Sequence, residues 1–246
     1  MKQPLIGLIL ALCLPAQEEK KADLPAPAGE VAAALQKTAK RGSFAFAGKL
    51  KTEVNPDDAD EEAITCALSG CVAPGSRTVV EIRADFSRHE IVLHAGKLAG
   101  RETWKGHPLD LLNAPSELFS LLDFERLAIY VKDATSVKAL PEEKVGPGDC
   151  GVTELVLPKG AIRSYHSDPE VAEEEEKSVK DVSLKVCVLK SEGLVVKMEA
   201  SVRRLHQDDH HPNDSTKGLS TFSFSLKEFG KAEVAIPPGL EKVLKE

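Results

Sequence analysis

The densest group of side chains that could bind a metal ion lies in a short polar segment near the end of the chain. It contains His206, Asp208, Asp209, His210, His211 and Asp214. Histidine nitrogens and carboxylate oxygens are common ligands of divalent metals. The same segment carries Pro212, Asn213 and Ser215, which are typical of a solvated hairpin loop. We therefore predict a loop between two strands here, and no metal site.

A second candidate is the glycine-rich sequence of residues 146–151, which matches the G-x-G-x-x-G pattern of dinucleotide-binding proteins. That pattern binds pyrophosphate only where it follows a strand and opens a helix, because the helix supplies free backbone N–H groups. Here a mostly polar stretch precedes it, and the strand-like residues 152–157 follow. The context favours a turn that enters a strand, and we predict no cofactor.

Cysteines form the third candidate group. Cys66, Cys71, Cys150 and Cys187 remain if the first residues are removed, and an even number in an oxidising compartment favours two disulfides. The simplest pairing joins Cys66 to Cys71 around a small loop and leaves Cys150 with Cys187. A zinc site is the alternative, but the spacing is not C-x-x-C and no histidine lies close in sequence.

Catalytic signatures are missing from the sequence. We find no G-x-S-x-G elbow, no H-E-x-x-H pair and no P-loop. The chain has 32 basic and 39 acidic residues with no basic block, which argues against nucleic acid as a partner. The sequence therefore favours a binding protein without enzymatic activity.

Residues 1–16 have the three-part pattern of a secretory signal, with Lys2, an apolar run from Leu5 to Leu14, and Ala16 at the expected cleavage site. The apolar run is too short to cross a bilayer. We expect a periplasmic or secreted protein, with a flexible leader over residues 17–28. Lipid attachment at Cys13 is the alternative, although Leu12 is bulkier than the residue that usually precedes a lipidated cysteine.

The elements expected after the leader are mainly strands. The spacing of apolar residues predicts a helix over 29–41, a second over 114–122 and an exposed helical insertion over 169–178. Alternation of apolar and polar residues predicts strands near 44–50, 80–86, 182–188, 196–202 and 222–226. Short turns between them predict an antiparallel meander, in one domain over residues 29–246.

The order of these elements resembles the LolA/LppX-like lipoprotein-carrier superfamily of bacterial envelope proteins. The likeness rests on "SFAFAGKL", on "APSELFSLLD", on "CGVTELVLP", and on a closing Phe229-Gly230 turn followed by Val234 and Pro237. It implies an α+β, mostly β fold, in which helices pack on the concave face of a curved antiparallel half-barrel sheet. Two stretches, residues 54–77 and 163–180, look like insertions relative to the family.

The resemblance also implies a function, in which an apolar cavity between sheet and helices holds an acyl chain or a lipoprotein. A cavity of this kind would be lined by ten residues, namely Phe44, Phe46, Val80, Ile82, Phe86, Leu118, Phe119, Met198, Phe222 and Phe224. The same side chains could instead form an ordinary filled core. The alternative function is an envelope sensor or scaffold that binds a protein partner and transports no lipid.

Overall fold

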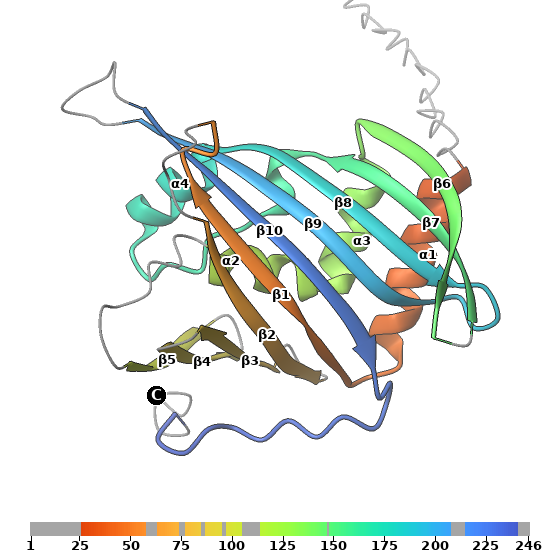
Figure 1. Ribbon diagram of the computed structural model, residues 1–246, viewed down its shortest axis with the longest axis horizontal. Helices are drawn as coiled ribbons and strands as arrows, with labels where there is room; N and C mark the ends of the chain where they lie inside the picture. The colour runs from red at the N-terminus through yellow and green to blue at the C-terminus, as the bar shows by residue number, and fades with distance from the viewer. Residues whose placement is uncertain are drawn as a thin grey trace, which may run out of the picture.

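A single curved antiparallel sheet dominates the computed structural model (Figure 1). The structure describes residues 26–57, 63–73, 77–84, 87–94, 97–104, 114–146, 148–207 and 215–240. Within them, ten strands follow the order β5-β4-β3-β2-β1-β10-β9-β8-β7-β6, and every neighbouring pair is antiparallel. The ends β5 and β6 do not pair, so the sheet is an open half-barrel, as predicted.

Ten strands and four α-helices account for most of the described chain. The strands are β1 (Phe44–Val54), β2 (Ile64–Ala73), β3 (Arg77–Ala84), β4 (Ser87–His94), β5 (Lys97–Trp104), β6 (Ser136–Val145), β7 (Gly148–Leu157), β8 (Val179–Leu189), β9 (Leu194–Gln207) and β10 (Ser215–Lys227). The helices are α1 (Ala26–Lys40), α2 (Ala114–Leu122), α3 (Phe124–Lys132) and α4 (Pro169–Ser178), with a short 3-10 turn at Lys159–Ala161.

Apolar and polar side chains alternate along the strands, so one face of the sheet is buried and the other is exposed to solvent. In β9, Met198, Ala200 and Val202 are buried, and Met198 and Ala200 pair with apolar residues on both β8 and β10. Glu199 and Lys197 point the other way and form ion pairs on the outer face. Because side chains of a strand alternate between faces, this pattern places the whole apolar face on the concave side.

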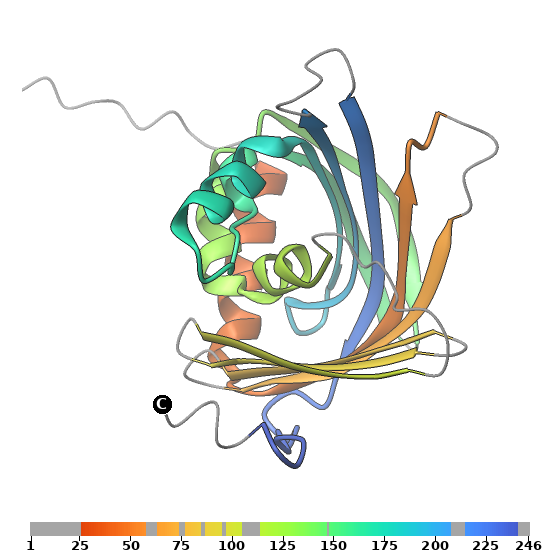
Figure 2. The ribbon, with the colours of Figure 1, turned by 90° about the vertical axis from the view of Figure 1, so that its left-hand side faces the viewer.

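The helices lie inside the curve of the sheet (Figure 2). Helix α1 packs against α3 and against the strands from β6 to β9. The N-terminus of α3 is capped by Asp123, whose side chain accepts a hydrogen bond from the backbone N–H of Arg126 at 3.1 Å. Asp168 caps α4 in the same way, with Pro169 in its first turn. Helices α1, α2 and α4 lie where the sequence predicts helices.

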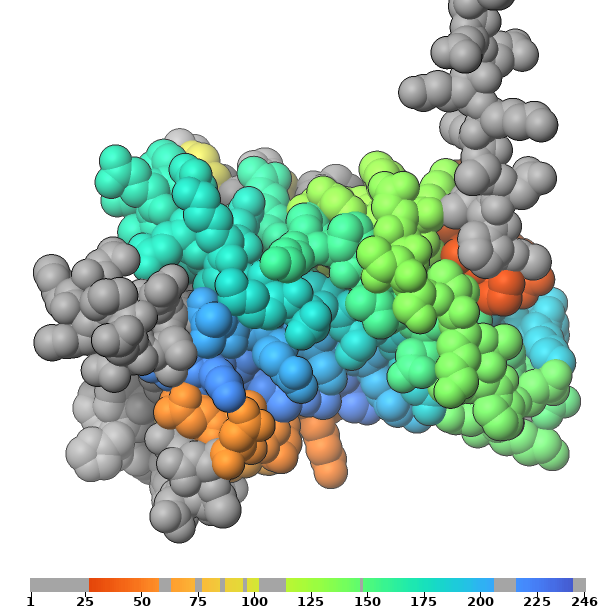
Figure 3. All heavy atoms as spheres, turned by 90° about the horizontal axis from the view of Figure 1, so that it is seen from above, coloured from red at the N-terminus to blue at the C-terminus, as the bar shows by residue number. Residues whose placement is uncertain are grey.

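The sequence patterns miss the edge strand β6 and the internal strand β2. Half of the residues of β6 are polar, and it contains Pro141, which suits an edge because proline cannot donate to a sheet ladder. The stretch 54–77, predicted as an insertion, contains β2, an integral strand between β1 and β3. Figure 3 shows β6 and α4 at opposite ends of one side of the molecule.

A buried ion pair connects α2 to the sheet. Arg204 of β9 donates from Nε to Oε1 of Glu117 at 2.6 Å, and the side chains are 4% and 0% exposed. Arg204 also donates to Ser178 Oγ at 2.8 Å and to the backbone carbonyl of Glu175. Burial raises the pKa of Glu117, and the charge of Arg204 acts in the opposite direction. The arginine thus joins α2, α4 and β9 at one point.

Replacement of Arg204 tests the contribution of this pair to stability. We expect Arg204→Leu to lower the free energy of unfolding by about 3–5 kcal/mol, because it leaves the Glu117 carboxylate buried without a partner. The double variant Glu117→Leu with Arg204→Leu should regain most of the loss, since no charge stays buried. Arg203→Leu is the matched control, because Arg203 is exposed. Urea unfolding of the four proteins measures the effect.

Candidate functional site

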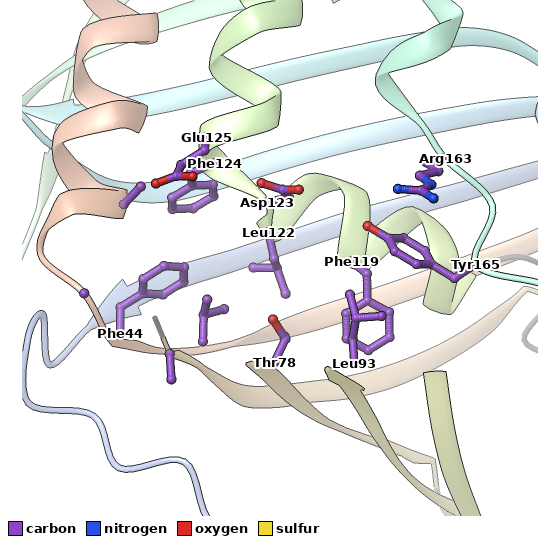
Figure 4. Close-up of a pocket in the computed structure, with 14 residues that line it drawn as sticks. Phe44, Thr78, Leu93, Phe119, Leu122, Asp123, Phe124, Glu125, Arg163 and Tyr165 are labelled. Atoms are coloured by element: carbon purple, nitrogen blue, oxygen red, sulfur yellow. The ribbon is translucent and has the colours of Figure 1, made fainter. Parts of the chain in front are cut away.

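A cavity of about 290 Å³ lies between the helices and the strands β1 to β4. Phe44 of β1 forms one end, where its ring stacks on Phe124 of α3 with centroids 5.0 Å apart and planes 7° apart. Phe119 and Leu122 of α2 project toward it from the helix layer (Figure 4). Its volume is close to the lower end of the range for small-molecule sites, about 300–1,000 Å³.

The floor of this cavity comes from neighbouring strands of the sheet. Val72 of β2 pairs with Thr78 of β3, and Thr78 pairs with Leu93 of β4. Residues directly opposite in a sheet project to the same face, so these three side chains form one continuous surface. Thr78 and Leu93 are each 6% exposed, which shows that helices and loops cover this floor.

The rim of the cavity is charged. Asp123 and Glu125 line it at the α2–α3 junction, and Arg163 lines it from the segment before α4 (Figure 4). Within the described residues, no side chain forms an ion pair with these three groups. The Arg163 guanidinium lies 5.6 Å from the centre of the Tyr165 ring. Burial raises the pKa of Tyr165, and the nearby Asp123 raises it further. The wall of the cavity thus combines aromatic and aliphatic side chains with charged ones, which suits an amphipathic ligand.

The residues predicted to line a cavity take two different positions. Phe44 and Phe119 line the cavity directly. Phe46, Val80, Ile82, Leu118, Met198, Phe222 and Phe224 lie in the same apolar cluster, each at most 1% exposed. Phe46 even fills the space above Gly70, where a Cβ would lie 2.6 Å from its ring. Phe86 lies outside the described residues.

Several cavity residues escape sequence reasoning. Leu93, Leu122, Phe124, Arg163 and Tyr165 all line it. The helical pattern of α2 could have indicated Leu122. Arg163 and Tyr165, in contrast, sit in a segment without periodicity, and only the path of the chain brings them over the sheet.

No disulfide joins any two of the four described cysteines in the structure. The predicted Cys66–Cys71 bridge is wrong for this fold, because both residues belong to one extended strand. Five residues of strand span about 16 Å, and an odd separation places the side chains on opposite faces. A disulfide needs Cα atoms within about 7 Å. Cys66 is accordingly buried in the core, whereas Cys71 is half-buried.

Cys150 and Cys187 lie together in a small apolar cluster away from the main core. They belong to the neighbouring strands β7 and β8, in diagonal positions, since Cys187 pairs with Val152 and Cys150 with Leu189. Burial raises the pKa of Cys187 to about 11, with a further contribution from Glu143. Their pairing stays a prediction.

The predicted turn at the glycine-rich motif is confirmed. It connects β6 to β7, and Gly146 has a φ of +60°, a value that glycine adopts without strain. No helix follows it, so the geometry of a dinucleotide site is missing. Residues 208–214 of the histidine and aspartate loop, and residues 1–25 with Cys13, lie outside the described residues. Within the described part of the chain, no three potential metal ligands come together, and no helix has the length and apolarity to cross a membrane.

No family model and no curated protein matches this chain. Solved structures with a similar arrangement include the lipoprotein LppX of Mycobacterium tuberculosis, at 12% identity and a TM-score of 0.41, over 88% of this chain and all 100% of that one. LprF of Mycobacterium bovis has 11% identity and a TM-score of 0.39, over 88% and 98%. A LolA superfamily protein of Nitrosomonas europaea has 13% identity and a TM-score of 0.29, over 87% and 96%.

Alkylation of the unfolded protein without reductant tests the cysteine positions. We expect Cys66 and Cys71 each to carry an alkyl group, because β2 holds the two thiols too far apart to form a disulfide. Peptide mapping by mass spectrometry reads the result, and a peptide closed by a Cys66–Cys71 bridge would contradict the register of β2. The same map decides Cys150 and Cys187, where a linked pair of peptides would confirm the predicted bridge.

Proposed function

We propose that this chain binds a hydrophobic ligand with an acyl chain in the cavity between α2, α3 and the strands β1 to β4, and carries it in the cell envelope. The observation that supports this is the cavity itself, with aromatic and aliphatic walls and a charged rim. Burial of each methylene group from water is worth about 0.8 kcal/mol, so even a short acyl segment gains useful affinity there. The function agrees with what the sequence resemblance implies.

The rim determines how such a ligand would lie. The acyl chain would lie along the floor from the Phe44 end, beneath Phe119 and Leu122, and its polar end would face the charged rim. The guanidinium group of Arg163 can donate hydrogen bonds to carboxylate or phosphate oxygens. The proposal contains no catalytic step and needs no cofactor.

A substitution that fills the cavity tests the proposal. Ala39 of α1 lines the cavity, and Ala33, on the same helix, is exposed. We expect Ala39→Phe to weaken acyl binding by about tenfold or more, because the ring would displace two or more methylenes and tenfold corresponds to about 1.4 kcal/mol. Ala33→Phe should bind as the unchanged protein does.

Displacement of the dye ANS by palmitic acid measures this affinity, and thermal unfolding checks that both variants are folded. Equal affinities of the folded Ala39→Phe and Ala33→Phe proteins would place the ligand elsewhere. An unchanged protein that takes up neither dye nor fatty acid would contradict acyl binding altogether.

Export is part of the proposal and has its own test. If residues 1–16 form a signal that is removed, the mature protein begins at Gln17. Expression in a bacterial host, followed by intact-mass measurement of the periplasmic fraction, should give the mass of residues 17–246. A mass that fits a diacylated chain starting at Cys13 would support lipid attachment instead, and an intact Met1 chain in the cytoplasm would contradict export.

A further inference from the structure

A single row of side chains crosses five strands beneath the helices. Phe44 pairs with Val72, Val72 with Thr78, Thr78 with Leu93, and Leu93 with Leu98. All five therefore project to the concave face, on β1, β2, β3, β4 and β5 in turn. Four spacings between strands of about 4.8 Å make this row about 19 Å long. The cavity described above uses only its first four members.

The fifth member, Leu98, lines a second pocket of about 550 Å³ at the β5 edge. This pocket is also lined by Ser116 of α2 and by Glu175 of α4. Leu98 is 38% exposed, one of two large apolar side chains so exposed in the described residues. The pocket thus continues the apolar floor of the first one toward the open edge of the sheet.

The two pockets are adjacent along both their floor and their roof. On the floor, Leu93 of the first pocket lies directly opposite Leu98 of the second. On the roof, Phe119 and Ser116 are three residues apart on α2, and residues at that spacing share one helix face. Among the described residues, Tyr165 is the one that lines both pockets. It lies at the end of the first cavity opposite Phe44 (Figure 4).

The Tyr165 ring is held firmly in this place. Its edge packs on Phe119, with centroids 6.1 Å apart and planes at 72°. The backbone around it is attached to both flanking helices. Ser120 Oγ of α2 accepts from the N–H of Arg163 at 2.9 Å, and Glu176 Oε1 of α4 accepts from the N–H of Ser164 at 3.0 Å.

From this geometry we propose that the Tyr165 ring is a partition between the two pockets, and that it limits the length of the bound acyl chain. The pocket lined by Leu98 then extends the binding site only where this ring is absent. The inference rests on the proposed function. A ring that lines both pockets, where the floor continues from Leu93 to Leu98, would stop a chain that extends along this floor from the Phe44 end. Without the ring, a longer chain can follow the row to β5 and bury more methylenes.

Binding of fatty acids of graded length tests the partition. We compare octanoic, decanoic, dodecanoic, palmitic and stearic acids by displacement of ANS. In the unchanged protein, affinity should stop rising with length once the chain reaches Tyr165. In Tyr165→Ala it should keep rising, so that the preference for stearic over decanoic acid grows about tenfold or more. Tyr165→Phe keeps the ring and should keep the original length profile.

A second substitution tests whether the added affinity for long chains comes from the pocket lined by Leu98. Leu98→Trp fills the outer pocket, and the exposure of Leu98 leaves room for the larger ring. In the Tyr165→Ala background it should abolish the added affinity for long chains, whereas alone it should leave decanoic acid binding unchanged. Thermal unfolding verifies that every variant is folded.

The possible results distinguish failure of the partition from failure of the proposed function. If the Tyr165→Ala protein keeps the original length profile, the partition is wrong and the proposed function stands. The same holds if adding Leu98→Trp to the Tyr165→Ala protein does not change its affinity for long chains. If the unchanged protein binds no fatty acid of any length, the proposed function fails and the partition fails with it. If Tyr165→Ala does not fold, Tyr165→Leu replaces it, since its smaller side chain also opens the passage.

Discussion

The concave apolar face of an unclosed sheet is the constraint on which the rest of this structure depends. A closed barrel shields its interior with its own strands, but β5 and β6 do not meet here, so helices must exclude water from that face. Helix α1 packs directly on β6 to β9, with α3 against it. Over β1 to β4 the cover is less tight, and the cavity occurs there.

A buried contact connects α2, which is part of the cover over β1 to β4, to strand β9. Helix α2 presents Glu117 to Arg204, and this arginine also bonds to α4. Buried charges are costly to desolvate, so such a pair contributes more to a defined arrangement than to net stability when compared with apolar residues. The pair joins β9 to the same helix that contributes Phe119 and Leu122 to the cavity.

The cavity then follows from register and not from any motif. A row of paired residues from Phe44 to Leu93 supplies the floor. The α2–α3 junction supplies Asp123 and Glu125 of the rim, and a segment without regular structure supplies Arg163 and Tyr165. The sheet and the residues above it thus contribute differently to binding. The sheet provides a long apolar surface that accepts many chains, and a few residues above it can select among them.

The sequence by itself determined the fold class, since period-two alternation in segments such as 196–202 and the helical spacing of 114–122 each fit one local structure. It also showed the glycine-rich turn, because only a strand follows Gly148. It could not assign β6, because no side chain of this edge strand is fully buried and so no apolar alternation marks it. It also could not show that Cys66 and Cys71 lie in one extended strand, where they are too far apart to bond, and not at the two ends of a loop. Only the tertiary structure decided that Phe44 and Phe119 line a cavity while Phe222 and Phe224 fill the core. Both sets are apolar in the same pattern, and what separates them is which side chains from distant parts of the chain surround them, which no local interaction encodes.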